Sequence, residues 1–179
     1  LIGSQRLIAG FLIFSVSYAS HLICHEGWRE NENKCYFFST DTKSWLEAQS
    51  FCLSQRSNLM SIQDIHERVR LQTHTLWIRT QIDAEIYWFG LNDRIAENVW
   101  EWADGDTYNE HLSFWAPGQP DNWGAEPGED CGQVLGGSYG QWNDENCNVK
   151  RKYICKHVNC KSTSYTHCLL MSHAQVGCS

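Results

Sequence analysis

Three short runs of this 179-residue chain decide its fold: Gln119-Pro120-Asp121-Asn122-Trp123, Glu129-Asp130-Cys131 and Trp142-Asn143-Asp144. They bring together side-chain oxygens of carboxylates and amides, namely Gln119, Asp121, Glu129, Asn143 and Asp144. Ca²⁺ prefers oxygen ligands of these kinds, whereas Zn²⁺ prefers His and Cys. The spacing differs from the calcium loop of helix–loop–helix proteins. The runs therefore predict a calcium site of another type, held in loops.

Charge is distributed unevenly around these runs. The formal net charge is −7, yet residues 93–145 hold twelve acidic residues and a single basic one, Arg94. Two interpretations stay open: a solvated acidic surface, which most charge runs are, or acids whose repulsion a bound cation relieves. A general nucleic-acid-binding surface needs net basic charge, so we expect no nucleic-acid partner.

The N-terminal residues 1–19 predict a secretory signal peptide. Arg6 precedes a mostly apolar run at 7–16, and the small residues Ser17 and Ala19 fit a cleavage site. The run is shorter than the ~20 residues that a membrane-spanning helix needs, so we expect no membrane span. A buried core helix is the alternative. Nine cysteines also favour an oxidising compartment, so we expect a secreted, extracellular, disulfide-stapled protein.

Residues 24–156 predict one domain of the α+β class. We expect a strand at Cys35–Phe38, a helix with Trp45, Ala48, Phe51 and Cys52 inward and Thr42 or Ser44 as cap, and a second helix over Ser61–Thr75. Four further short strands are predicted at Tyr87–Leu91, Val99–Trp102, Cys131–Leu135 and Tyr153–Lys156. Two helices followed by strands and long loops are typical of α+β folds. Residues 157–179 are interpreted as a C-terminal tail.

Longer motifs make the pattern specific. They are Trp88-Phe89-Gly90-Leu91, Trp100-Glu101-Trp102-Ala103-Asp104-Gly105, the three runs above with Glu145-Asn146-Cys147 attached, and Tyr153-Ile154-Cys155. In this order, over about 24–156, they resemble the C-type lectin domain family. The resemblance implies two helices, small antiparallel sheets and a long calcium-binding loop region.

The resemblance also implies three disulfides, whereas the sequence alone leaves fifteen pairings of six cysteines open. The implied pairs are Cys24–Cys35, Cys52–Cys155 and Cys131–Cys147. Three more cysteines, Cys160, Cys168 and Cys178, lie in the tail. An odd number allows a disulfide-linked homodimer, and a free or mispaired thiol is the alternative.

The family's principal calcium site corresponds to Gln119, Asp121, Glu129, Asn143 and Asp144, and its ion is completed by two adjacent sugar hydroxyls. Gln-Pro-Asp resembles the type that prefers galactose and N-acetylgalactosamine. Trp123 stands where such members place an aromatic residue, although core packing is the alternative. The loop 124–128 departs from the longer Gly-rich loop of strong galactose binders, which leaves the strictness of the preference open.

An auxiliary calcium site of the family corresponds to Asp93, Glu97, Asn122 and Asp130, with Glu129 shared. Asn122 offers a neutral amide where a carboxylate would bind Ca²⁺ better. The resemblance therefore implies a weak second site.

Two other motifs resemble reactive or metal-binding sites without matching their requirements. Gly136–Gly140 matches a G-x-S-x-G nucleophile pattern around Ser138, but the context predicts a hairpin rather than the strand–turn–helix that this chemistry needs. A zinc site formed from Cys155, His157, Cys160, His167 and Cys168 has no standard spacing.

The sequence thus predicts a calcium-dependent lectin that binds glycans with terminal galactose or N-acetylgalactosamine and performs no reaction. Within the family, a type II antifreeze-like ice-binding protein and a lectin-like domain that binds a protein partner are the alternatives. A hydrolase is a third, but no nucleophile is paired with an oriented base.

Overall fold

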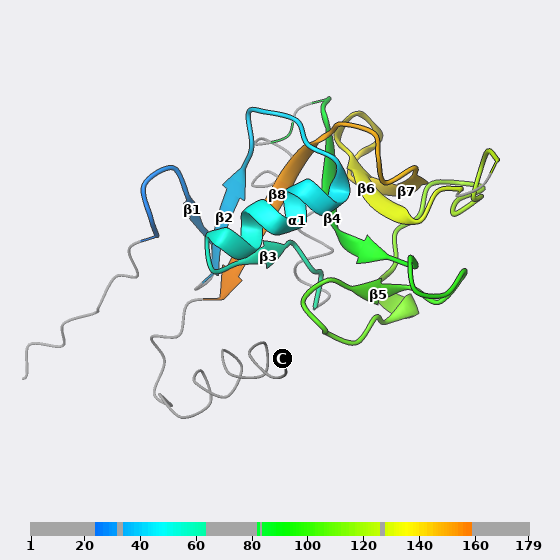
Figure 1. The fold of residues 1–179 in the computed structure, drawn as a ribbon, viewed down its shortest axis with the longest axis horizontal. Helices are drawn as coiled ribbons and strands as arrows, with labels where there is room; N and C mark the ends of the chain where they lie inside the picture. The colour runs from blue at the N-terminus through cyan, green and yellow to red at the C-terminus, as the bar shows by residue number, and fades with distance from the viewer. Residues whose placement is uncertain (1–23, 32–33, 64–81, 83, 126–127, 159–179) are drawn as a thin grey trace, which may run out of the picture.

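A mixed β-sheet with the helix α1 (Trp45–Ser54) packed across it organises the described part of the chain (Figure 1). The structure, a computed structural model, describes residues 24–31, 34–63, 82, 84–125 and 128–158. Its elements are β1 (Arg29–Asn31), β2 (Lys34–Phe38), α1 (Trp45–Ser54), β3 (Asn58–Leu59), β4 (Ile86–Asn92), β5 (Glu101–Trp102), η1 (Glu110–Leu112), β6 (Cys131–Leu135), η2 (Gly136–Ser138), β7 (Gln141–Glu145) and β8 (Lys152–Val158). The strand order is β1-β2-β8-β4-β6-β7, with β3 beside β8 and β5 beside β4.

The helix α1 begins where its sequence predicts. Ser44 is the N-cap: its hydroxyl accepts a hydrogen bond from the Glu47 N–H, and the Glu47 carboxylate accepts one from the Ser44 N–H. This reciprocal capping box satisfies two N–H groups that a helix start otherwise leaves unpaired. Trp45, Ala48 and Cys52 are buried, as predicted, while Phe51 is only partly buried.

The sheet is mixed rather than antiparallel. β8 pairs antiparallel with β2 but parallel with β4, through Tyr87 opposite Lys152 and Trp88 opposite Tyr153. A parallel neighbour needs a long crossover connection, and here the chain between β4 and β8 includes the entire loop region. The expectation of small antiparallel sheets was therefore wrong for this one pair.

Several elements begin or end at residues other than those predicted. β5 contains only Glu101 and Trp102, because Val99 is 61% exposed and its N–H closes a turn onto the Ala96 carbonyl. β8 runs two residues beyond the predicted domain end at Lys156. Ser61–Gln63 is not helical, and the rest of the predicted second helix lies outside the described residues.

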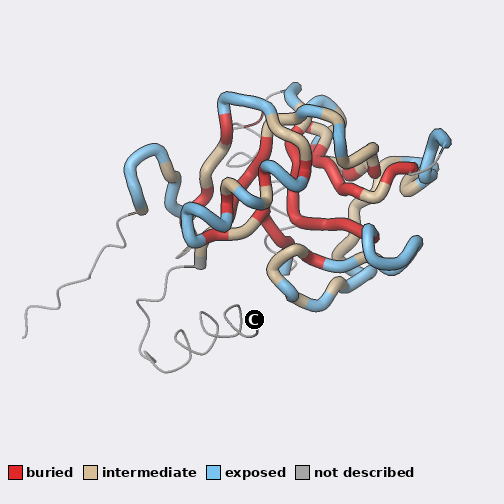
Figure 2. The backbone as a smooth tube through the Cα atoms, in the orientation of Figure 1, coloured by how far each residue is buried: buried red, intermediate tan, exposed pale blue. Residues whose placement is uncertain are grey.

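Two apolar clusters lie on the two sides of the central strands. One surrounds Phe89, Trp102 and Trp142, whose rings meet at centroid distances of 5.2–6.2 Å. The other joins α1 to Trp88 and Tyr153. Figure 2 shows the buried strands in the middle of the molecule and the exposed connections around them. This core gives the loops a rigid base.

Three disulfides confirm the implied pairing. Cys24–Cys35, Cys52–Cys155 and Cys131–Cys147 have Cα–Cα distances of 5.6, 5.5 and 5.2 Å. Cys155 is therefore not a zinc ligand. Cys160, His167, Cys168 and Cys178 lie outside the described residues.

The hairpin predicted around Gly136–Gly140 is confirmed. One turn of 3-10 helix, η2, joins the antiparallel strands β6 and β7, so Ser138 is not followed by the helix that a nucleophile elbow requires. None of the helices in the described part of the chain is long and apolar enough to cross a bilayer.

Candidate functional site

The site is built on the end of β7. In this strand Trp142 and Asp144 are buried while Gln141, Asn143 and Glu145 are partly exposed, which is the alternation of a half-buried strand. Trp142 fixes the strand in the core. Asp144 consequently places a carboxylate, 1% exposed, at the base of the loops.

Backbone pairing brings the loop of the Gln-Pro-Asp run to this carboxylate. The Trp142 N–H donates to the Phe114 carbonyl, and the Ala116 N–H donates to the Trp142 carbonyl, each at 2.8 Å. The chain then turns, and the N–H groups of Asp121 and Asn122 donate to the two Asp144 oxygens at 3.2 and 2.8 Å. The Asp144 carboxylate thus holds the loop in place by accepting from the loop's backbone N–H groups.

Three carboxylates converge here. One oxygen each of Asp121, Glu129 and Asp144 lies within 4.8 Å of the other two. Glu129 is 9% exposed and also accepts a hydrogen bond from the Trp123 N–H at 3.2 Å. Carboxylates this close repel one another, and a cation coordinated by their oxygens removes that repulsion.

The electrostatics of the cluster agree with its crowding. Burial, with smaller contributions from the charges of Asp144, Glu145 and Asp121, raises the pKa of Glu129 to about 7. Burial also raises the pKa of Asp144, against the lowering effect of its backbone hydrogen bonds. Without a cation the cluster therefore favours protonation.

The two amides predicted as ligands differ in what surrounds them. Gln119 has a buried Oε1 without a hydrogen-bond partner among the described residues, an arrangement that a metal ion or a ligand hydroxyl would satisfy. The Gln119–Pro120 peptide bond is cis. Asn143 lies on β7 opposite Gln133, and its Nδ2 donates to the Asp144 carbonyl, which leaves its side-chain oxygen for another partner.

Trp123 does not pack in the core. Its side chain is 76% exposed, which rejects the alternative of ordinary core packing. A cleft of about 280 Å³ runs between residues 97–100 and 120–122, with Asp144 among its walls. An exposed indole beside polar groups can stack against the apolar face of a ligand.

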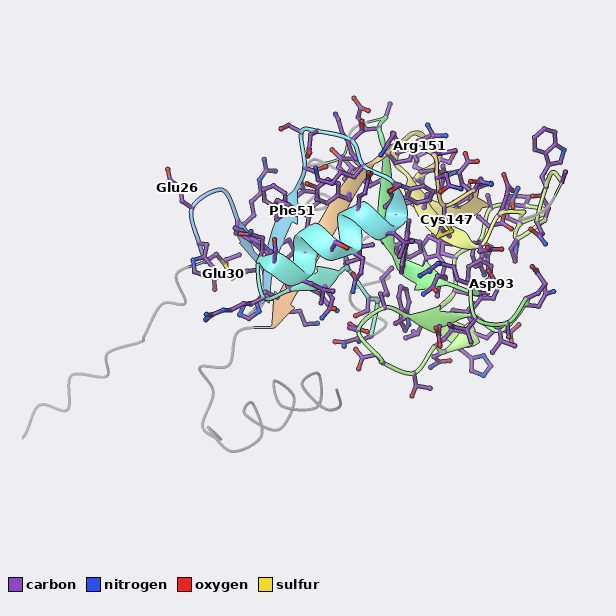
Figure 3. The ribbon with its side chains drawn as sticks, viewed as in Figure 1. Glu26, Glu30, Phe51, Asp93, Cys147 and Arg151 are labelled. Carbon is purple, nitrogen blue, oxygen red and sulfur yellow. A yellow bond between two sulfur atoms is a disulfide. The ribbon has the colours of Figure 1, made fainter. Side chains whose placement is uncertain are left out.

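The auxiliary residues are near one another without forming a comparable cluster. The Asp93 N–H donates to the Asp130 carbonyl at 3.1 Å, which joins the ends of β4 and β6; Figure 3 shows Asp93 on the side of the molecule opposite Glu26 and Glu30. Asp93 is 3% exposed, and burial, followed by the charges of Glu97 and Asp130, raises its pKa to about 6. Among the described residues, only Asp121, Glu129 and Asp144 form a group of three acids with converging oxygens.

Sequence reasoning missed the residues that position the ligands. Gly128 has φ +77°, and a Cβ there would lie 2.1 Å from Asn122 Oδ1. The sequence feature that could have indicated this role is the position of Gly128 directly before the predicted ligand Glu129. Arg94 places its guanidinium 5.2 Å from the ring centre of the buried Trp45, which ties the loop after Asp93 to α1. No sequence spacing indicates that contact.

Comparison with known proteins agrees with this geometry. A family model described as "Lectin C-type domain" matches residues 41–157. The chain is 37% identical over 136 residues to rat C-type lectin domain family 10 member A, covering 74% of this chain and 41% of that protein. It is 32% identical over 141 residues to rat asialoglycoprotein receptor 1, covering 77% and 46%. The chain thus spans less than half the length of these relatives.

Solved structures give the same result. The mouse scavenger receptor C-type lectin carbohydrate-recognition domain superposes with a TM-score of 0.66 at 34% identity, over 76% of this chain and 98% of that one. A calcium-independent type II antifreeze protein has a TM-score of 0.65 over 79% and 98%, but at 23% identity it shows the fold alone. The disulfides, the sheet and the matched length leave one assignment: the chain belongs to the C-type lectin domain family.

Proposed function

We propose that this domain is a calcium-dependent lectin that binds terminal galactose or N-acetylgalactosamine. The observation that carries the proposal is that one carboxylate oxygen each of Asp121, Glu129 and Asp144 lies within 4.8 Å of the other two. Gln119 and Asn143 are the two amides we expect to complete the site. Carboxylate and amide oxygens are the donor set that Ca²⁺ prefers.

The same side chains can read a sugar. When bound, Ca²⁺ supplies open coordination positions for two adjacent hydroxyl groups. The carboxylates of Asp121 and Glu129 accept hydrogen bonds from hydroxyls, and the amides of Gln119 and Asn143 donate to them. The exposed Trp123 offers a flat apolar surface for the carbon face of galactose. Binding therefore needs no covalent chemistry, and we propose no enzymatic activity.

Support for the galactose type comes from two sources. Gln119 precedes Pro120 and Asp121 follows it, which places the amide and the carboxylate as the galactose type has them. One relative is named as a receptor for asialoglycoproteins, which are glycoproteins without terminal sialic acid. We also propose secretion, because three disulfides are typical of oxidising compartments.

The decisive experiment is retention on immobilised galactose with and without EDTA. We expect retention in calcium, elution by EDTA or by free galactose, and loss of retention for Asp144→Asn. Glu101→Gln is the matched control, since Glu101 is exposed on β5 outside the cluster. Retention that EDTA leaves unchanged would contradict the metal-bridged mechanism.

Ice binding is the alternative to separate from this. The antifreeze neighbour carries the same fold, so fold alone does not discriminate. Thermal hysteresis of the purified protein, measured with and without calcium, does. We expect none.

A further inference from the structure

Asn122 forms hydrogen bonds with three other segments of the site, one through its backbone and two through its side chain. Its N–H donates to Asp144 Oδ2 at 2.8 Å. Its Oδ1 accepts from the Glu129 N–H at 2.7 Å, and its Nδ2 donates to Glu97 Oε2 at 2.9 Å. One residue therefore joins the Gln-Pro-Asp loop, the Glu129 backbone and the loop that carries Glu97.

These contacts occupy both ends of the amide. The side-chain oxygen, the atom that an auxiliary calcium would need, is held against the Glu129 N–H, from which it accepts a hydrogen bond. Gly128 packs so closely that any side chain there would displace this oxygen. The nitrogen, which cannot coordinate a cation, is the atom that faces Glu97.

Among the described residues, the acids around Asn122 do not form a second cluster like that of Asp121, Glu129 and Asp144. Asp93 uses Oδ2 to accept from the Asn98 N–H at 2.8 Å, which closes its own loop. Its buried Oδ1 has no partner among the described residues, so this atom alone would favour a cation. Within the described chain, however, the carboxylate oxygens of Asp93, Glu97 and Asp130 do not converge as those of Asp121, Glu129 and Asp144 do.

We infer that the hydrogen bonds of Asn122 hold the Glu97 loop in place of a second calcium ion, so that the domain binds one ion. This inference rests on the proposed calcium site and makes Asn122 a positioning residue. The amide N–H donates to Glu97 and places a partial positive charge beside the carboxylate, where an auxiliary cation would otherwise lie. An aspartate at the same position would place a second carboxylate against Glu97, and that pair would need a cation to stay together.

The test is to count the calcium ions bound per chain by equilibrium dialysis of the whole protein at saturating calcium. We expect one ion for the wild type and two for Asn122→Asp. Glu97→Gln is the matched variant, because a glutamine still accepts from Asn122 Nδ2. It should bind one ion with unchanged affinity. Asn122→Ala should also bind one ion, about tenfold more weakly, because hydrogen bonds that order the Glu129 loop are lost.

Two results would overturn the inference. Two ions in the wild type, falling to one in Glu97→Gln, would mean that the auxiliary site binds calcium despite Asn122. No bound ion in the wild type would contradict the proposed function as well, whereas two ions would leave that function standing. The failure of the inference and the failure of the function are therefore distinguishable.

Discussion

The helix-and-strand half of this domain and its site loops, residues 93–98, 117–125 and 128–130, are stabilised by opposite means. In the first, α1 packs on β8 through the Cys52–Cys155 disulfide, and the Phe51 ring meets Tyr153 at 5.3 Å. The site loops are held by hydrogen bonds from backbone N–H groups to buried carboxylates, from Asn122 to Asp144 on β7 and from Trp123 to Glu129. Figure 3 shows Phe51 on the helix side and Asp93 on the loop side.

The difference teaches where calcium matters. Apolar burial stabilises the first half under any metal concentration, since the hydrophobic effect depends on area removed from water. The site loops bury like charges, which is unfavourable until a cation or protons neutralise them. Folding of the core and assembly of the site should therefore respond to different perturbations.

The largest expected effect on stability comes from replacing a tryptophan by alanine in the core, and the same replacement in the site loops is its comparison. Trp88 is fully buried, and its Nε1 donates to the Lys43 carbonyl at 3.0 Å. Trp88→Ala should lower the free energy of unfolding by about 3–5 kcal/mol, because it leaves a cavity in the core. Trp123→Ala, at an exposed side chain, should change it by less than about 0.5 kcal/mol and weaken galactose binding instead. Denaturant unfolding and galactose retention check both, and a comparable loss of stability in the two variants would contradict the division.

A smaller effect is expected from pH on the metal-free protein. Glu129 has a folded pKa of about 7, above its ordinary 4.5, so the folded state binds its proton more tightly than the unfolded state does. The resulting stability is complete below pH 4.5 and is lost as the pH rises towards 7, on the order of 1–3 kcal/mol. With saturating calcium the trend should reverse, because the ion needs the deprotonated carboxylate.

Thermal unfolding between pH 4.5 and 8, with and without calcium, measures this pair of slopes. Glu129→Gln should remove much of the metal-free slope. Burial lowers the pKa of His157, and this makes stability rise with pH, opposite to the effect of Glu129. The quantity to compare is therefore the difference in slope between Glu129→Gln and the wild type. Equal slopes for the two proteins would show that Glu129 is not the group responsible.

The smallest effect on stability should accompany a large effect on specificity. Exchanging Gln119→Glu together with Asp121→Asn keeps one carboxylate and one amide, so calcium should still bind. Stability should change by less than about 0.5 kcal/mol. The donor moves around the ion, and a hydroxyl pair that suited the first arrangement leaves a group unpaired in the second. Preference should shift from galactose towards mannose by about five- to 150-fold. Competition by the two free sugars is the measurement, and an unchanged margin with calcium retained would show that this motif does not read the sugar.

The sequence by itself determined the elements whose signals are local. Ser44 with Glu47 indicated the start of α1, and the β-rich runs indicated β2, β4 and β6. The ligand types were equally visible, because carboxylates and amides identify the preferred metal without any coordinates. The motif order gave the family and with it the three disulfides.

Only the tertiary structure decided what depends on contacts between distant segments. The parallel pairing of β4 with β8 joins residues more than sixty positions apart, and a strand's own sequence does not state its partner. Val99 is apolar yet exposed, because the turn onto Ala96 ends the strand pattern there. Asn122 is the clearest case. The sequence shows that its side chain is an amide. Which of the amide atoms faces Glu97 and which faces Glu129 depends on how the folded core places the loops beside one another.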